Sequence, residues 1–103
     1  AYGEYVDPAF QTQAFALAAA HENVLVSRTF SKAYGLAAER VGWVTGSAHL
    51  IDLVNRLRGA FNVSVSGQKA ALAALGDQAF VARSRNHNAT ERQRLADAIA
   101  MLG

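Results

Sequence analysis

The sequence contains no cysteine, and it has one proline, one methionine and one tryptophan in 103 residues. The absence of cysteine excludes disulfides, zinc–thiolate sites, iron–sulfur clusters and cysteine catalysis. No apolar stretch approaches the ~20 residues that a membrane-spanning helix needs, so we expect no membrane partner. We therefore expect one small soluble domain without an internal boundary.

Charge and histidine content exclude two further classes of partner. With 10 Lys plus Arg against 8 Asp plus Glu, the net charge of +2 is too small to favour nucleic acid. His21, His49 and His87 lie 28 and 38 positions apart without acidic companions, so no metal site is predicted. No export signal is recognisable, which makes the cytoplasm the expected location. The chain opens on Ala1 without an initiator Met, so we expect it to be cut from a longer protein.

Hydrophobic periodicity predicts the order helix, strand, strand and then three helices. Asp7 and Pro8 are typical of a helix start, Gly59 of a left-handed helix end, and Asp77 of the cap of a last, long helix. The predicted elements are a helix over 7–20, strands over 23–28 and 41–45, and helices over 47–58, 64–76 and from 77 onward. So few strands cannot form a covered parallel sheet, which predicts an α/β fold that is incomplete.

Residues 27–43 hold the densest group of chemically useful side chains. They place two hydroxyls and Lys32 in a turn between the two predicted strands, with Arg40 eight residues further on. A lysine amine can form a Schiff base with an aldehyde, and hydroxyls with a guanidinium can bind a phosphate. That combination suits pyridoxal phosphate. Taken alone, the pattern also fits a solvated surface lysine and a surface arginine, and both interpretations stay open on the residues.

The run from Arg28 to Trp43 resembles the lysine motif of the aspartate-aminotransferase superfamily, and most closely that of the histidinol-phosphate aminotransferases. The family pattern is Arg-Thr-(Phe/Leu)-Ser-Lys-Ala-(Tyr/Phe)-Gly-Leu-Ala-Gly-Leu-Arg-(Val/Ile/Leu)-Gly-(Trp/Tyr). Residues 1–5 are similar to the family's Asp-Glu-Ala-Tyr-x-Glu-Phe strand, and residues 58–64 to an Arg-Gly-Pro-Phe-Asn-Val-Ser loop. The resemblance covers essentially all 103 residues. It implies part of the large domain of a fold-type-I enzyme, with about 77–103 beginning the long helix toward the small domain.

The resemblance also implies a role for each matching residue, with pyridoxal 5'-phosphate as the cofactor. Lys32 would be the catalytic Schiff-base lysine, and Thr29, Ser31 and Arg40 would bind the cofactor phosphate. Tyr2 would donate to the cofactor's ring hydroxyl, although on residues alone a half-buried strand tyrosine is the simpler interpretation.

The implied activity is transfer of an amino group between histidinol phosphate and 2-oxoglutarate by a homo-oligomeric enzyme. An aromatic aminotransferase or a phosphothreonine decarboxylase fits the same lysine motif. The family's aspartate for the ring nitrogen, its glycine-rich loop and its small-domain arginine do not occur in these 103 residues. A self-associating fragment without activity is therefore the rival hypothesis. Ala38-Glu39 replaces the usual Gly-Leu and places a carboxylate beside Arg40, where it could compete with phosphate.

Overall fold

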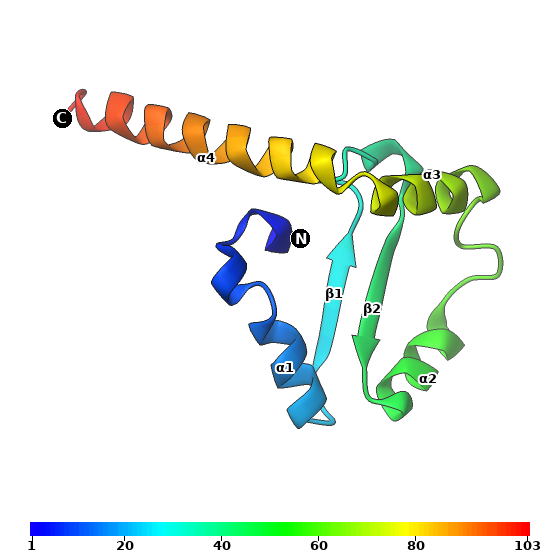
Figure 1. The fold of residues 1–103 in the computed structure, drawn as a ribbon. Coiled ribbons are helices and arrows are strands. Elements are labelled where there is room, and N and C mark those ends of the chain that lie inside the picture. The colour runs from blue at the N-terminus through cyan, green and yellow to red at the C-terminus, as the bar shows by residue number, and fades with distance from the viewer.

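The computed structural model describes all 103 residues and has the predicted order of elements (Figure 1). Three short 3-10 helices, η1 (Gly3–Tyr5), η2 (Pro8–Phe10) and η3 (Ala37–Glu39), accompany two strands and four α-helices. The longer elements are α1 (Gln13–Ala20), β1 (Leu25–Thr29), β2 (Gly42–Gly46), α2 (Ala48–Leu57), α3 (Val65–Gly76) and α4 (Gln78–Ala100). The helices and the small sheet confirm a partial α/β domain that ends in a long helix.

The two strands pair with each other in an antiparallel sheet, a pairing that periodicity alone does not specify. Arg28 lies opposite Trp43, and Thr29 lies opposite Gly42. A Cβ on Gly42 would stand 2.7 Å from the carbonyl oxygen of Arg28, so only glycine allows this close approach. The glycine therefore fixes where the long loop between the strands begins and ends.

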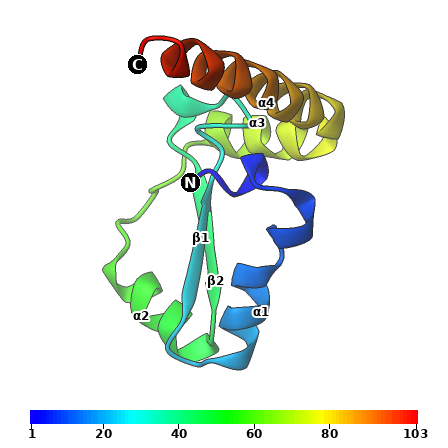
Figure 2. The same ribbon diagram turned by 90° about the vertical axis from the view of Figure 1, so that its left-hand side faces the viewer.

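Helices cover the two faces of this hairpin. Figure 2 views the hairpin nearly edge-on, with α1 on one side and α2 on the other. Phe15 of α1 stacks on Trp43, with ring centroids 5.8 Å apart and an interplanar angle of 8°. The Arg28 guanidinium carbon lies 4.9 Å from the centroid of the Phe15 ring. This aromatic and cationic stack attaches α1 to the hairpin.

The hydrophobic core lies at the end of the hairpin that faces α3 and α4. Its buried members are Phe30, Val41 and Ala71, with partly buried side chains from the neighbouring loop and α3 around them. A Cβ on Gly67 would lie 2.8 Å from Val41 Cγ2, so α3 approaches the start of β2 unusually closely. The core thus holds both ends of the loop that carries Lys32.

Three local predictions were wrong. The helix expected over 7–20 is two elements, because the Gln11 side chain turns back and donates to the carbonyl oxygens of Glu4 and Val6. Gly59 does not end α2 in a left-handed conformation; the extended Arg58 ends it, and Phe61 has the positive φ of 56°. Residues 1–5 form no strand, since η1 follows Tyr2 directly.

Side chains cap the starts of the later helices, and the cap predicted at Asp77 is confirmed. Ser47 and Ser64 accept from backbone N–H groups at the starts of α2 and α3, and Asp77 Oδ1 accepts from the Phe80 N–H at 2.9 Å. Each side chain satisfies a backbone donor that the first turn of a helix leaves unpaired.

The chain exposes far more surface than a compact protein of its mass. Only 7 of 103 residues are buried, and the accessible surface is 7555 Å², where a compact monomer of this mass would expose about 5,600 Å². The radius of gyration is 16.7 Å, against roughly 13 Å for a compact domain of this length. Leu95 and Ile99 of α4 are among the exposed apolar side chains. No helix combines the length and the apolar character that crossing a bilayer requires.

Candidate functional site

The loop between the strands is closed by its own hydrogen bonds. The Phe30 N–H donates to the Val41 oxygen at 3.0 Å, and the Leu36 N–H donates to the Phe30 oxygen at 2.9 Å. Inside this loop the Gly35 N–H donates to the Lys32 oxygen at 2.9 Å, and Gly35 has a φ of 72°. Glycine adopts that conformation without the cost that other residues bear. Lys32 therefore begins a tight, defined turn.

Lys32 lies between two buried residues, Phe30 and Ala33. Phe30 is 4% exposed and Ala33 is 1% exposed, whereas Lys32 is exposed. The Phe30 ring also packs on Tyr34, with centroids 4.9 Å apart. Because the apolar neighbours face the core, the lysine side chain is directed out of it.

Tyr2 and Lys32, which are 30 positions apart in the sequence, meet in the structure. Lys32 Nζ lies 5.5 Å from the centroid of the Tyr2 ring, within the range of a cation–π contact. No carboxylate pairs with this amine. Tyr2 remains 60% exposed, so it is not the half-buried strand residue of the simpler interpretation. The structure thus leaves both polar groups accessible on one side of the lysine turn.

The three residues assigned to phosphate differ in what else they bind. The Thr29 hydroxyl accepts from the Ser31 N–H at 3.1 Å and lies 3.5 Å from the Val41 oxygen, to which it donates. One guanidinium nitrogen of Arg40 donates to the Ala37 oxygen at 2.9 Å. Arg40 has a left-handed backbone with φ 55° and ψ 40°, a conformation that costs a non-glycine residue about 1–2 kcal/mol. Its remaining N–H groups point to no protein acceptor within hydrogen-bond distance.

The Glu39 carboxylate does not pair with Arg40. Glu39 Oε2 instead accepts from the Ser66 hydroxyl at 3.2 Å, across 27 positions of sequence. The expected competition with phosphate is therefore absent in this arrangement, and Ser66 is a residue that sequence reasoning missed. No spacing rule links a loop residue to the first turn of a helix so far along the chain.

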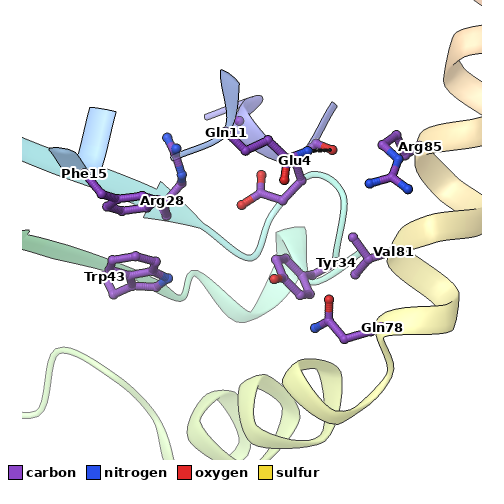
Figure 3. A pocket seen from close by; sticks show the side chains of 10 residues that line it. Glu4, Gln11, Phe15, Arg28, Tyr34, Trp43, Gln78, Val81 and Arg85 are labelled. Carbon is purple, nitrogen blue, oxygen red and sulfur yellow. Dashed lines mark hydrogen bonds between the residues drawn. The ribbon is translucent and has the colours of Figure 1, made fainter. Parts of the chain in front are cut away.

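A polar cavity of about 250 Å³ lies between the N-terminal segment, β1 and α4 (Figure 3). Glu4, Arg28 and Arg85 line it together with Tyr34. The Glu4 Oε2 atom is buried and has no hydrogen-bond partner in the protein. A cavity of this size and polarity accommodates ordered water, which can satisfy such an oxygen. Lys32 does not line this cavity.

The donor set fits a phosphorylated aldehyde. It offers an accessible amine without an ion pair at Lys32, a hydroxyl at Ser31 and a guanidinium at Arg40, all on the loop that joins β1 to β2. An aldehyde needs the amine and a phosphate monoester needs the cationic and hydroxyl donors. One loop of the chain therefore carries an exposed lysine amine together with hydroxyl and guanidinium groups.

The sequence profile of the family described as aminotransferase class I and II matches residues 1–103, and the chain belongs to this family. It is 62% identical over all its residues to the histidinol-phosphate aminotransferase of Erythrobacter litoralis. It is also 53% identical over 102 residues to the protein of the same name from Zymomonas mobilis. A crystal structure of a proposed histidinol-phosphate aminotransferase from Erwinia carotovora atroseptica superposes with a TM-score of 0.87 at 35% identity, over 99% of this chain.

Those relatives are much longer than this chain. The chain spans 28% of the Erythrobacter and Zymomonas proteins and 30% of the Erwinia protein. The family and the fold are thus established for the chain, while the activity of a whole enzyme is a separate question.

Proposed function

We propose that this chain is the lysine-bearing part of the large domain of a pyridoxal-phosphate-dependent aminotransferase of the histidinol-phosphate type. The observation that carries the proposal is the loop from Thr29 to Arg40. It combines an accessible, unpaired amine with phosphate donors, inside a chain that matches the aminotransferase class I and II profile along its whole length. The names of the most similar relatives support histidinol phosphate as the amino donor and histidine biosynthesis as the pathway.

The proposal gives each loop residue a task. The Lys32 amine would hold the cofactor through its aldehyde group, and as a free amine it would accept the proton of the substrate's α-carbon. Thr29, Ser31 and Arg40 would hold the phosphate, and the Thr29 hydroxyl also accepts from the backbone N–H of Ser31. The Tyr2 hydroxyl would donate to the cofactor's ring oxygen. When bound, the cofactor supplies the electron sink that stabilises a carbanion.

Reductive trapping tests the lysine assignment. Lys32 and Lys69 are the only lysines, and both are exposed, so Lys69 is the matched control. The protein is incubated with pyridoxal phosphate and reduced with borohydride, and the labelled peptide is identified by mass spectrometry. We expect the label on Lys32, its loss in Lys32→Ala and its retention in Lys69→Ala. Equal labelling of both lysines, or none, would refute a specific cofactor site.

The substrates and the assembly belong to the same proposal. An amino-phosphate donor such as histidinol phosphate, with 2-oxoglutarate as acceptor, is expected for the complete enzyme, which we expect to act as a homo-oligomer in the cytoplasm. Transamination assays on the complete enzyme with histidinol phosphate, aromatic amino acids and phosphothreonine distinguish the aminotransferase from the two related activities that share its lysine motif.

A second role, self-association without catalysis, is favoured by the exposed surface. The excess of about 2,000 Å² over a compact monomer is more than the roughly 800 Å² that each partner buries in a standard protein–protein interface. A cavity of about 620 Å³ lined mainly by apolar side chains, among them Phe30, Trp43 and Leu72, opens between β2 and α3. Sedimentation velocity tests this role. Dimers of the 103-residue chain that bind no pyridoxal phosphate would favour it over the enzymatic proposal.

A further inference from the structure

We infer that the Glu39–Ser66 hydrogen bond keeps the Glu39 carboxylate away from Arg40, so that Ser66 is a positioning residue for phosphate binding. The inference rests on the proposed function of Arg40. It concerns a position where this chain departs from the family motif, since Glu39 stands where leucine is usual.

The Glu39 carboxylate accepts one side-chain hydrogen bond, from Ser66. Ser66 Oγ donates to Glu39 Oε2 at 3.2 Å, and Ser64 Oγ lies 3.0 Å from Ser66 Oγ. Ser64 Oγ also accepts from the Gly67 N–H at 3.0 Å. These contacts form a continuous relay in which Gly67 N–H donates to Ser64, Ser64 donates to Ser66, and Ser66 donates to Glu39. The Ser64 and Ser66 hydroxyls each donate one hydrogen bond in this relay.

The backbone brings Glu39 to the same place independently. A Cβ on Gly67 would lie 3.3 Å from the Glu39 carbonyl oxygen, so η3 packs on the first turn of α3. The N-terminal end of a helix carries a partial positive charge that favours a carboxylate. Two features, the Ser66 hydroxyl and the helix end, therefore hold the charge on the α3 side of the loop.

The alternative position for that carboxylate is beside Arg40. Arg40 is the next residue in the chain, and only one of its nitrogens is engaged, by the Ala37 oxygen. A carboxylate and a phosphate compete for the same guanidinium fork. Without the Ser66 hydroxyl, the Glu39 carboxylate is stabilised more by pairing with Arg40. A bound phosphate must then displace the carboxylate from the guanidinium.

The size of the effect follows from the strength of an exposed ion pair. Such pairs contribute about 0.2–1 kcal/mol, and RT is about 0.59 kcal/mol, so Ser66→Ala should weaken cofactor affinity by a factor of roughly 1.4 to 5. The loss should shrink at high salt because exposed ion pairs are screened.

The test compares pyridoxal phosphate with pyridoxal, which lacks the phosphate. Ser66→Ala should lower the affinity for pyridoxal phosphate and leave that for pyridoxal unchanged. Ser66→Thr, which keeps the hydroxyl, and the double variant Glu39→Gln with Ser66→Ala, which removes the competing charge, should both restore affinity. Glu22→Gln is the charge-matched control, because Glu22 is exposed and precedes the first residue of β1, Leu25, whereas the lysine loop follows the last, Thr29.

Three outcomes overturn the inference: no change in Ser66→Ala, an equal loss for both ligands, or a double variant as weak as Ser66→Ala. If the wild-type protein does not bind pyridoxal phosphate at Lys32, the proposed function fails instead. The inference is then still decided by titrating inorganic phosphate while following the Arg40 Nε–H signal by NMR. A shift that is the same in wild type and Ser66→Ala refutes it, and a weaker response in Ser66→Ala supports it.

Discussion

The substitution Gly67→Ala adds one methyl group and tests how closely α3 packs against its neighbours. Gly67 is the third residue of α3, and alanine in a helix ordinarily stabilises it by about 0.5–1 kcal/mol relative to glycine. Here the added Cβ would lie 2.8 Å from Val41 Cγ2 and 3.1 Å from Ser64 Oγ. Val41 is 8% exposed and β-branched, so its side chain cannot turn away easily.

The expected result of Gly67→Ala is therefore a net loss of stability. Overpacking a close contact costs about 1–3 kcal/mol, which exceeds the propensity gain and leaves a destabilisation of roughly 1–2 kcal/mol. The assay is denaturant unfolding of the protein, followed by circular dichroism. Hydrogen exchange at the Phe30 amide gives a local measurement, because this amide donates to Val41 and should exchange faster when β2 is displaced.

Gly76→Ala is the matched control within the same helix. A Cβ on Gly76 meets no atom within 4 Å and its φ is not positive, so this variant should be stabilised by up to about 1 kcal/mol. If Gly67→Ala raises the unfolding midpoint as Gly76→Ala does, the close packing of α3 against Val41 is wrong.

Three further predictions concern the hairpin, the long helix and the phosphate donors. Phe15→Ala should lower stability by about 2–3 kcal/mol and shift the emission of Trp43, the sole tryptophan, to the red; an unshifted spectrum contradicts the stacking. Asp77→Ala should cost about 1 kcal/mol and Asp77→Asn much less, as measured by thermal unfolding; equal losses would show that the cap is not the cause. Arg40→Gly should relieve the left-handed backbone and keep or raise stability, yet lower the affinity for pyridoxal phosphate by at least about tenfold; unchanged affinity would remove Arg40 from the phosphate site.

The local signals in the sequence were reliable where a few neighbouring residues decide the structure. Ser47, Ser64 and Asp77 cap helices because their side chains satisfy backbone donors three residues away. The Gly35 turn and the apolar residues around Lys32 are local in the same sense. The lysine motif therefore predicted which segment belongs to the family, and the family profile confirms the assignment of the chain.

Contacts between distant segments could not be predicted from local signals in the sequence. The break in the expected helix depends on Gln11 reaching the oxygens of Glu4 and Val6, which competes with helix propagation. Stacking of Phe15 on Trp43 and the approach of Tyr2 to Lys32 both need the chain to be folded first. The energy of each contact depends on a partner residue that the hydrophobic periodicity of the sequence does not identify.

Composition excluded cysteine chemistry, and the motif by itself identified Lys32, Ser31 and Arg40 as candidates. Tertiary structure alone decided that Glu39 bonds to Ser66 rather than to Arg40, and that α3 packs on Val41 and η3 through Gly67. The physical reason is the separation along the sequence between the residues that interact. Caps and turns are set by hydrogen bonds within one turn of chain, whereas the direction of the Glu39 carboxylate is set by a hydroxyl 27 positions away that only folding brings near.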